Sequence, residues 1–524
     1  MSRLAAACRS LVADARREPV TAALFAAAMV ATLLPIWIGR YLPLLDYPNH
    51  LSVTFVWRHL HEPWWDFDRY YTTHLVPLPY WVGYGAVYAM SLVVGTAVAQ
   101  KLFLTLAIAL LPLTVALYAR AMGRDPRLAI FAFPLAWNYN VGFGFISYAA
   151  GLPALFFSLW LLDRFATAPS VKRGLVAAAA GASLYFFHIL TWGTWLLVGG
   201  VVALATPRPW RPLRALVAPL PTLPAAALGL WAYLTSRTMD VKTIPNTGNG
   251  LAGYQFVFYE PSGVLKNLPD WLLNLFTDSR DEWFAVGLAL VWLLLLTTRA
   301  LVPAGASDDD PDRGSARAWR VELASAVAIV LLFKLPRTIH QPFYWYAINS
   351  RLAVLVALLA ALWVRGPLVG ARRALWVGAA LLSIGFGADV AAHYRRFNQR
   401  AHGFDVVMEG VPHGARVLPL MMTLGDRELN VNCYNQWGSY VQLHTGGFVP
   451  WNNDISFPLR QLDRLAAPPW NHPEMFSFAA YGSQWDYFLI HGPTTGDPFA
   501  RAHDKVRLAA QSGDWQLWQK LANP

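Results

Sequence analysis

The chain has 524 residues, of which 56% are hydrophobic and only 14% are charged, and its mean hydropathy is +0.35. These values argue against a soluble enzyme and are typical of a protein that crosses a membrane many times. The net charge of +11 does not indicate nucleic-acid binding, because the arginines fall in short clusters between apolar runs. The two cysteines, Cys8 and Cys433, are too few for a disulfide framework or a cysteine metal site.

Twelve apolar segments are long enough, or nearly long enough, to cross a bilayer. They lie at about 20–41, 79–97, 100–119, 127–141, 145–163, 172–189, 191–206, 213–234, 283–299, 320–335, 351–365 and 374–391. The first segment lacks a small-residue cleavage site, so we expect a retained helix and not a signal peptide.

The positions of Lys and Arg predict how these segments are oriented. Clustered arginines place the following on the cytoplasmic side: the tail 1–19 and the loops 120–127, 164–173, 208–214 and 365–373. This leaves one crossing between an outer loop at 42–78 and the loop at 120–127, where two apolar segments occur. We expect the segment 79–97, which is rich in Pro and Gly, to lie at or dip into the outer face. Alternatively, 79–97 crosses and a segment within 127–163 is re-entrant.

The sequence predicts three regions: a cytoplasmic tail at 1–19, a transmembrane domain at 20–395, and a small extracytoplasmic α/β domain at 396–524. The transmembrane domain is predicted to be an all-α bundle of about 11–12 helices, with outer loops at 42–78, 235–282 and 336–350.

The third region shows strand-like runs and a probable hairpin. The runs are "RVLPLM", "SYVQLH" and "WDYFLIHG", and the hairpin is "VRLAAQSGDWQLWQK". The polar stretch "GASDDDPDRGSAR" at 305–317 has the composition of a disordered linker. High usage of Ala, Arg and Trp suits a bacterial inner membrane protein, whose outer side, including the C-terminus, would be periplasmic.

The motif "LLDYPNHL" at 44–51 begins the first outer loop. If a helix starts there, Asp46 and His50 lie on one face at i and i+4. Such a pair could provide a general base with its hydrogen-bonding partner, or two metal ligands. Alternatively, Asp46 serves as the cap of this helix.

Two other motifs carry charges on the predicted outer side. In "WWDFDRYY" at 64–71, Asp66 and Asp68 form a D-x-D pair that could chelate a divalent cation, although a solvated loop explains the same residues. Arg351 opens an apolar segment at the outer interface, against the positive-inside trend. Its guanidinium suits a lipid phosphate, and a snorkelling arginine is the alternative.

Several uncharged side chains near predicted outer helix ends could line a substrate pocket. They are Asn138, Tyr139, His188, His340, Tyr344 and Tyr346. Asn138 and Tyr139 could equally satisfy the backbone of a membrane turn. A lone histidine such as His188 is commonly a hydrogen-bonded structural residue.

The layout of this chain resembles that of the GT-C glycosyltransferase superfamily, which includes protein O-mannosyltransferases and the lipid A aminoarabinose transferase. The motifs that carry the resemblance are "LLDYPNH" at 44–50, "GRDPR" at 123–127, "SRLAVL" at 350–355 and the closing hairpin. The resemblance implies a catalytic base at Asp46 and contact between Arg351 and the phosphate of a lipid-linked donor. The family often has two adjacent acids in the first loop, where this chain has Tyr47, and an acid where it has "WNYN".

The resemblance implies transfer of a glycosyl group from a polyprenyl-phosphate sugar to an acceptor glycan, lipid or protein, by an inverting mechanism at the extracytoplasmic face. His50 would orient Asp46 or share a divalent metal ion with it. Two other classes remain open: a transporter or flippase of lipid-linked sugars, and a non-catalytic membrane assembly subunit. A transporter would favour charged residues within helices and internal repeats, and the sequence shows neither clearly.

Overall fold

The computed structural model describes residues 18–75, 79–205, 216–236, 256–298, 319–339, 345–450, 458–462, 465–469, 472–494 and 496–521. The helices are α2 (Pro19–Trp37), α3 (Tyr47–His59), α4 (Trp81–Ser91), α5 (Thr96–Ala121), α6 (Ala132–Leu135), α7 (Tyr139–Gly142), α8 (Ile146–Thr167), α9 (Val171–Phe187), α10 (Ile189–Leu204), α12 (Leu223–Ser236), α13 (Pro261–Leu273), α14 (Arg280–Thr297), α15 (Arg320–Lys334), α16 (Ile348–Ala361), α17 (Ala371–Met408), α18 (Tyr440–Thr445) and α19 (Phe478–Tyr481). The strands are β1 (Tyr71–Thr73), β2 (Phe256–Val257), β3 (Thr338–Ile339), β4 (Val417–Met421), β5 (Leu459–Gln461), β6 (Tyr487–His491), β7 (Val506–Ser512) and β8 (Trp515–Lys520).

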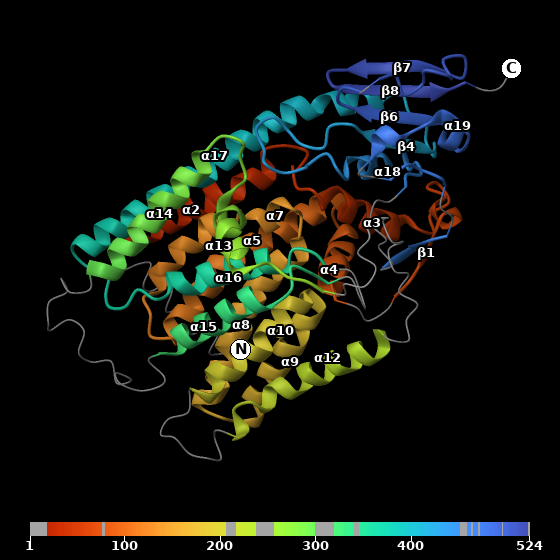
Figure 1. Cartoon of the computed structure of the whole chain (residues 1–524). Helices are drawn as coiled ribbons and strands as arrows, with labels where there is room; N and C mark the ends of the chain where they lie inside the picture. Colours follow the sequence, from red (N-terminus) through yellow and green to blue (C-terminus); the bar gives the residue numbers. More distant parts are fainter. Residues whose placement is uncertain are drawn as a thin grey trace.

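Most of the described chain forms a helical bundle (Figure 1). Among the described residues, four helices are long and apolar enough to cross a membrane: α2, α5, α8 and α17. The chain therefore has the helices of a multi-pass membrane protein. Shorter apolar helices, such as α10 and α16, pack among them.

Two of the predicted apolar segments do not form long helices. Helix α4 has 11 residues, about 16 Å at 1.5 Å per residue, and is too short for a bilayer core of about 30 Å. Other apolar helices such as α16, with 14 residues, are also shorter than the core, so the expectation that 79–97 does not cross stays a prediction. The segment 127–141 forms the 3-10 turn Pro126–Phe131 followed by α6 and α7, and not one helix. The capping side chain of Asn138 starts a new turn there.

Charged side chains gather at one end of the bundle, which we call the arginine end. It comprises Glu18, Arg124, Arg127, Asp163, Arg320, Glu322, Arg365 and Arg372. Arg124 and Arg365 both bind Glu322, at 2.9 and 2.5 Å. The predicted cytoplasmic loops at 120–127 and 365–373 thus lie together, as a shared side of the membrane requires.

The C-terminal region forms a small mixed sheet at the other end of α17, which we call the sheet end (Figure 1, upper right). The strand order is β4-β6-β8-β7. β4 and β6 are parallel, and the remaining pairs are antiparallel. The predicted hairpin is present as β7 and β8, and Gly513 in its turn has a φ of +56°. The predicted run "SYVQLH" is not a strand but contains α18, which ends at Gly446 with a φ of +65°.

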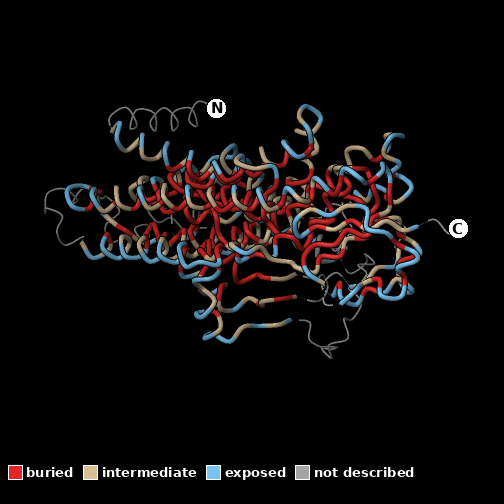
Figure 2. The backbone as a smooth tube through the Cα atoms, turned by 90° about the horizontal axis from the view of Figure 1, so that it is seen from above, coloured by how far each residue is buried: buried red, intermediate tan, exposed pale blue. Residues whose placement is uncertain are grey.

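The predicted domain boundary at 395/396 falls inside α17, which continues to residue 408. Phe397, Ala401 and Phe404 recur at helical spacing and are buried, so the apolar face of α17 extends past the predicted boundary. The C-terminal half of α17 packs against β7 and β8. Buried segments run from the bundle into the sheet region (Figure 2), and one hydrophobic core includes side chains from both.

Candidate functional site

The first predicted outer loop contacts the turn between α7 and α8. The backbone N–H groups of Leu45 and Asp46 donate to the carbonyls of Gly142 and Phe143, at 3.0 and 3.1 Å. Gly144 permits this approach: its φ is +83°, and a Cβ there would lie 2.7 Å from the Asp46 nitrogen. Two segments predicted on the same side therefore form one surface.

Asp46 occupies the N-cap position of α3, but its side chain makes no capping hydrogen bond. Instead, the side-chain amide of Gln436 donates to Asp46 Oδ1 at 3.4 Å. The carboxylate is therefore directed toward the C-terminal region and does not act as a helix cap. Capping alone does not explain why an acid stands at this position.

The His50 side chain meets Tyr84 of α4. Its Nδ1 lies 2.7 Å from the Tyr84 hydroxyl, and that hydroxyl lies within the electrostatic influence of Asp46. Burial lowers the pKa of His50 from 6.5 to about 4, so its imidazole is neutral at neutral pH. The predicted pair at i and i+4 is thus part of a trio with Tyr84, a residue that the sequence analysis did not select.

Arg351 lies in the first turn of α16 and is only 5% exposed. Its guanidinium donates to the Tyr346 carbonyl at 2.7 Å and stacks 3.9 Å from the centre of the Phe145 ring. Within the described chain, Arg351 Nε has no hydrogen-bonding partner and the side chain forms no ion pair. The nearby Asp46 carboxylate contributes to its electrostatic environment. The positive charge is therefore buried without direct neutralisation.

Asparagines hold Arg351 in register with the turn before α8. Asn138 caps α7 by accepting the N–H of Asn140 at 2.9 Å, which is the structural role considered for it. Asn140 accepts a hydrogen bond from the Ser350 hydroxyl at 2.8 Å and donates to the Ser350 carbonyl at 3.1 Å. The motif "WNYN" therefore positions the residue next to Arg351.

His188 is buried at the start of α10, where its Nδ1 accepts the N–H of Leu190 at 3.1 Å. Its ring stacks on Trp345, with ring centres 5.8 Å apart and an angle of 7°. Tyr80 and Tyr148 meet the same imidazole edge-on. His188 thus has a capping role and also belongs to an aromatic cluster close enough to Arg351 to be affected by its charge.

Tyr139 and Tyr346 lie together, since their side chains interact. The guanidinium of Arg337 lies 5.7 Å from the centre of the Tyr346 ring. Tyr346 is thus placed beside the turn that contains Tyr139. His340 and Tyr344, predicted in the same loop, lie outside the described residues.

The predicted metal ligands Asp66 and Asp68 stand on the exposed loop between α3 and β1. Asp66 is 4.0 Å from Arg69. The described parts of the chain contain no group of three or more His, Cys, Asp or Glu side chains arranged to hold a metal ion. The structure therefore gives the D-x-D pair no further ligands, and the solvated-loop interpretation fits its exposure.

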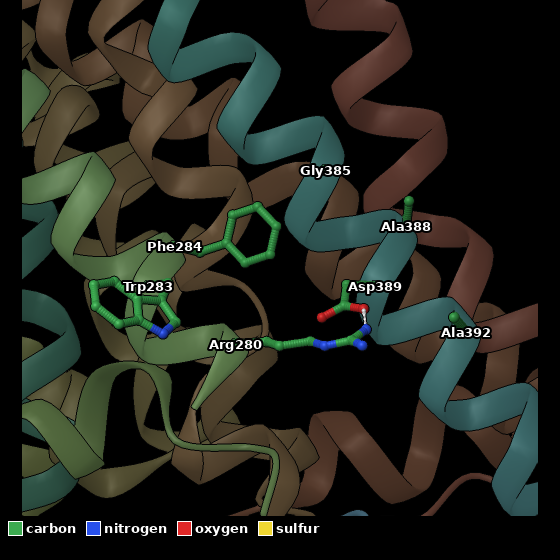
Figure 3. A pocket seen from close by; sticks show the side chains of 7 residues that line it. All are labelled: Arg280, Trp283, Phe284, Gly385, Ala388, Asp389 and Ala392. Carbon is green, nitrogen blue, oxygen red and sulfur yellow. Dashed lines mark hydrogen bonds and ion pairs between the residues drawn. The ribbon is translucent and has the colours of Figure 1, made fainter. Parts of the chain in front are cut away.

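A groove of about 490 Å³ lies between α14 and α17 (Figure 3). Aromatic side chains and small residues line it, with an ion pair of 3.2 Å between Arg280 and Asp389 at one edge. In Figure 1, α14 lies at the left of the bundle and α3 at the right. The groove is therefore separate from the cluster around Asp46.

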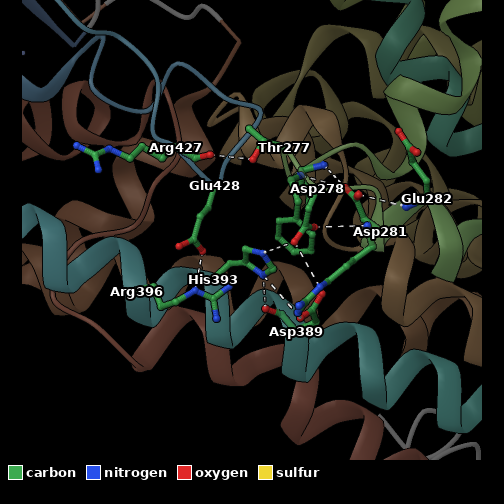
Figure 4. A network of polar contacts seen from close by, with 12 residues as sticks. Thr277, Asp278, Asp281, Glu282, Asp389, His393, Arg396, Arg427 and Glu428 are labelled. Carbon is green, nitrogen blue, oxygen red and sulfur yellow. Dashed lines mark hydrogen bonds and ion pairs between the residues drawn. The ribbon is translucent and has the colours of Figure 1, made fainter.

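A polar network ties α14 and α17 to the segment after β4 (Figure 4). His393 stacks on Phe276 at 3.8 Å, and its Nδ1 lies 2.9 Å from the Asp389 carbonyl. Arg396 binds Glu428 at 2.6 Å, and the hydroxyl of Thr277 donates to the Arg427 carbonyl. These paired groups fasten the C-terminal region to the bundle.

No protein-family model, curated protein or solved structure matches this chain. The function is therefore inferred from the geometry of the site at the sheet end. That geometry joins Asp46, His50, Tyr84, His188, Trp345, Arg351 and Gln436 from segments far apart in the sequence.

Proposed function

We propose that this protein is a GT-C type membrane glycosyltransferase. It transfers a glycosyl group from a polyprenyl-phosphate sugar to an acceptor hydroxyl at the sheet end, with inversion at the anomeric carbon. In this proposal the bundle has about 11–12 helices and lies in a bacterial inner membrane. The sheet end faces the periplasm. The clustering of the basic loops at the arginine end supports this orientation.

The observation that carries the proposal is a buried Arg351 that forms no ion pair in the described chain and lies within the electrostatic influence of Asp46. Burying a guanidinium without a carboxylate is unfavourable unless an anion compensates its charge. A lipid-linked donor brings a phosphate to the site from within the membrane. Arg351 Nε, which has no partner among the described residues, is available as a donor to such a phosphate.

The chemistry needs only groups that this cluster contains. The acceptor oxygen attacks the anomeric carbon while the bond from that carbon to the phosphate oxygen breaks. Asp46 takes the proton of the acceptor hydroxyl, and Arg351 stabilises the negative charge of the departing phosphate. Neutral His50 holds Tyr84 beside the carboxylate without adding a competing positive charge.

The test is glycosyl transfer from labelled polyprenyl-phosphate sugars in proteoliposomes, with cell-envelope glycans and lipids as acceptors. Asp46→Asn keeps the size of the side chain but removes the base, so transfer should fall by about 100-fold or more. Asp68→Asn is the matched control, because this exposed carboxylate should not affect transfer.

Equal transfer by wild type and Asp46→Asn would overturn the proposed mechanism. Movement of labelled donor across the bilayer without transfer would indicate a flippase. If purified protein neither transfers nor translocates the donor, a non-catalytic assembly subunit becomes the better description.

A further inference from the structure

Helix α3 packs one face against residues 436–442 of the C-terminal region, and we call this contact the α3 seam. Its members are Asp46, Asn49, Ser52, Gln436 and Gln442. Asp46, Asn49 and Ser52 are spaced three residues apart, so they lie along one side of the helix. Gln436 meets Asp46, and Gln442 accepts the Ser52 hydroxyl. Asn49 stands between Asp46 and Ser52 along this side of α3.

The three amides of the α3 seam differ in their hydrogen bonds. Gln442 uses both ends of its side chain, because its amide N–H also donates to the Tyr71 hydroxyl at 2.8 Å. Asn49 is fully buried, and neither of its amide atoms has a partner among the described residues. Gln436 is 3% exposed, and its Oε1 likewise has no partner there. Two unpaired amides thus lie beside the proposed base.

An aromatic residue on the same helix shares this property. The hydroxyl of Tyr47 is buried without a partner in the described chain, and it lies within the electrostatic influence of Tyr440. Unpaired buried polar groups are unfavourable, and native proteins keep few of them. Several at one contact, next to Asp46, indicate groups kept for a ligand.

We propose that Asn49 and Gln436 bind hydroxyl groups of the acceptor, and that the acceptor of this transferase is itself a sugar. This inference rests on the proposed function and names its acceptor class. An amide offers both a donor and an acceptor, which matches the neighbouring hydroxyls of a pyranose, and it adds no charge that would select an anion.

Gln436 then has two functions in the site. Its N–H group directs the Asp46 carboxylate, and its Oε1 accepts a hydrogen bond from an acceptor hydroxyl. Gln436 is thus a positioning residue for Asp46 as well as a binding residue. The C-terminal region completes the site and is not an independent module.

The first test measures the melting temperature of the full chain by intrinsic tryptophan fluorescence, in a detergent that carries no sugar. The variants are Asn49→Leu and Gln436→Met, which replace the unpaired amides with apolar side chains of similar size. The matched control is Gln442→Met, in which a fully paired amide is lost. The probes are the methyl glycosides of glucose, galactose, mannose and N-acetylglucosamine.

At least one glycoside should stabilise the wild type. Without a glycoside, Asn49→Leu should melt about 2 °C above wild type, since it removes only unsatisfied groups, and both Asn49→Leu and Gln436→Met should lose the glycoside response. Gln442→Met should melt below wild type. The inference is overturned if Asn49→Leu melts lower than wild type, if the two variants retain the glycoside response, or if no glycoside stabilises the wild type.

The transfer assay separates this inference from the proposed function. Asn49→Leu should raise the acceptor KM by about tenfold, while Gln436→Met should both raise that KM and lower kcat. If transfer depends on Asp46 but both variants keep the wild-type acceptor KM, only the acceptor site is wrong. If glycosides bind through these amides but no transfer occurs, only the proposed reaction is wrong.

Discussion

Two buried arginines show that burial alone does not identify a functional residue. Arg372, at the arginine end, donates to the carbonyls of Leu295, Arg365 and Pro367, at 2.8 to 3.3 Å. Its charge thereby compensates the negative ends of helix dipoles. Arg351 has fewer carbonyl partners, stacks on Phe145 and lies near the carboxylate of the proposed base. The second environment favours an anionic ligand.

We expect Arg351→Lys to raise the KM for the polyprenyl-phosphate donor by about tenfold or more, because an ammonium group cannot present two parallel N–H donors to a phosphate. Arg372→Lys is the matched control and should leave the donor KM unchanged. Initial rates at varied donor concentration check this expectation. An unchanged donor KM in Arg351→Lys would remove Arg351 from the site.

Individual site residues were predictable where a local pattern exposed them. Asp46 and Arg351 stand out because each places a charge directly beside an apolar segment. Gln436 and Asn49 carry no such signal, since an amide in a mixed stretch has many ordinary explanations. Gln436 reaches Asp46 through a contact between α3 and a segment almost 400 residues later. No local sequence pattern predicts such a contact.

At the scale of elements, hydrophobic periodicity located the long apolar helices. It failed where tertiary contacts determine the secondary structure of a segment. The run "SYVQLH" is rich in residues that favour strands, yet it contains α18 because it follows a 3-10 turn and packs against α3. The predicted apolar segment 374–391 stops short of the end of α17, because the later turns of this helix carry charged residues beside a continuing apolar face.

The end of α18 depends on Gly446. Its φ is +65°, and a Cβ would lie 2.6 Å from the Trp65 ring. We expect Gly446→Ala to destabilise the fold by about 3 kcal/mol, through backbone strain and overpacking. Gly513→Ala shares the positive φ but meets no atom within 4 Å, so it should cost about 1 kcal/mol. Thermal unfolding of the two variants compares them directly, and equal losses would contradict the packing argument.

A polar junction joins the end of α2 to α17 and α18. His444 Nε2 lies 3.0 Å from the Tyr41 hydroxyl and 3.2 Å from Arg40. Asp405 accepts hydrogen bonds from both Arg40 and Tyr41. Burial, together with the charge of Arg40, lowers the pKa of His444 from 6.5 to about 4. The junction therefore contains a histidine that stays neutral in the folded protein.

This histidine should make the fold less stable in acid. Between pH 6.5 and about 4, the unfolded chain binds a proton at His444 that the folded protein does not bind, so stability falls as the pH decreases through this window. The contribution is roughly 3 kcal/mol at most, at 1.36 kcal/mol per pKa unit. His444→Gln should flatten the fall in melting temperature between pH 7 and pH 4.5, whereas His503→Gln, at an exposed site, should not. Parallel pH curves for His444→Gln and wild type would contradict this assignment.

At the scale of the whole molecule, charge separates the two ends of the bundle. The arginine end joins the loops at 120–127 and 365–373, which were predicted on one side, and the sheet end collects Asp46, Arg351 and the C-terminal strands. The predicted sidedness depends on a sum of many charges and tolerates local errors, and it stays a prediction. The domain boundary could not be predicted, because one continuous core joins the bundle and the C-terminal region.

The orientation can be tested with single cysteines and a membrane-impermeant maleimide. In a Cys8→Ser background, buried Cys433 should stay unreactive. Asp504→Cys at the sheet end and Val93→Cys, between α4 and α5, should react in intact spheroplasts. Val171→Cys, at the start of α9, should react only after permeabilisation, because the loop at 164–173 is basic and should remain inside.

Each labelling pattern distinguishes a different error in this topology. Reaction of Val171→Cys alone in intact spheroplasts would reverse the orientation and place the proposed site on the cytoplasmic side. Protection of Val93→Cys together with labelling of Asp504→Cys would mean that α4 and its flanking residues cross the membrane. The expected pattern places Asp46 on the side opposite the basic loops, where a transferase that uses an outward-facing lipid-linked donor must expose its base.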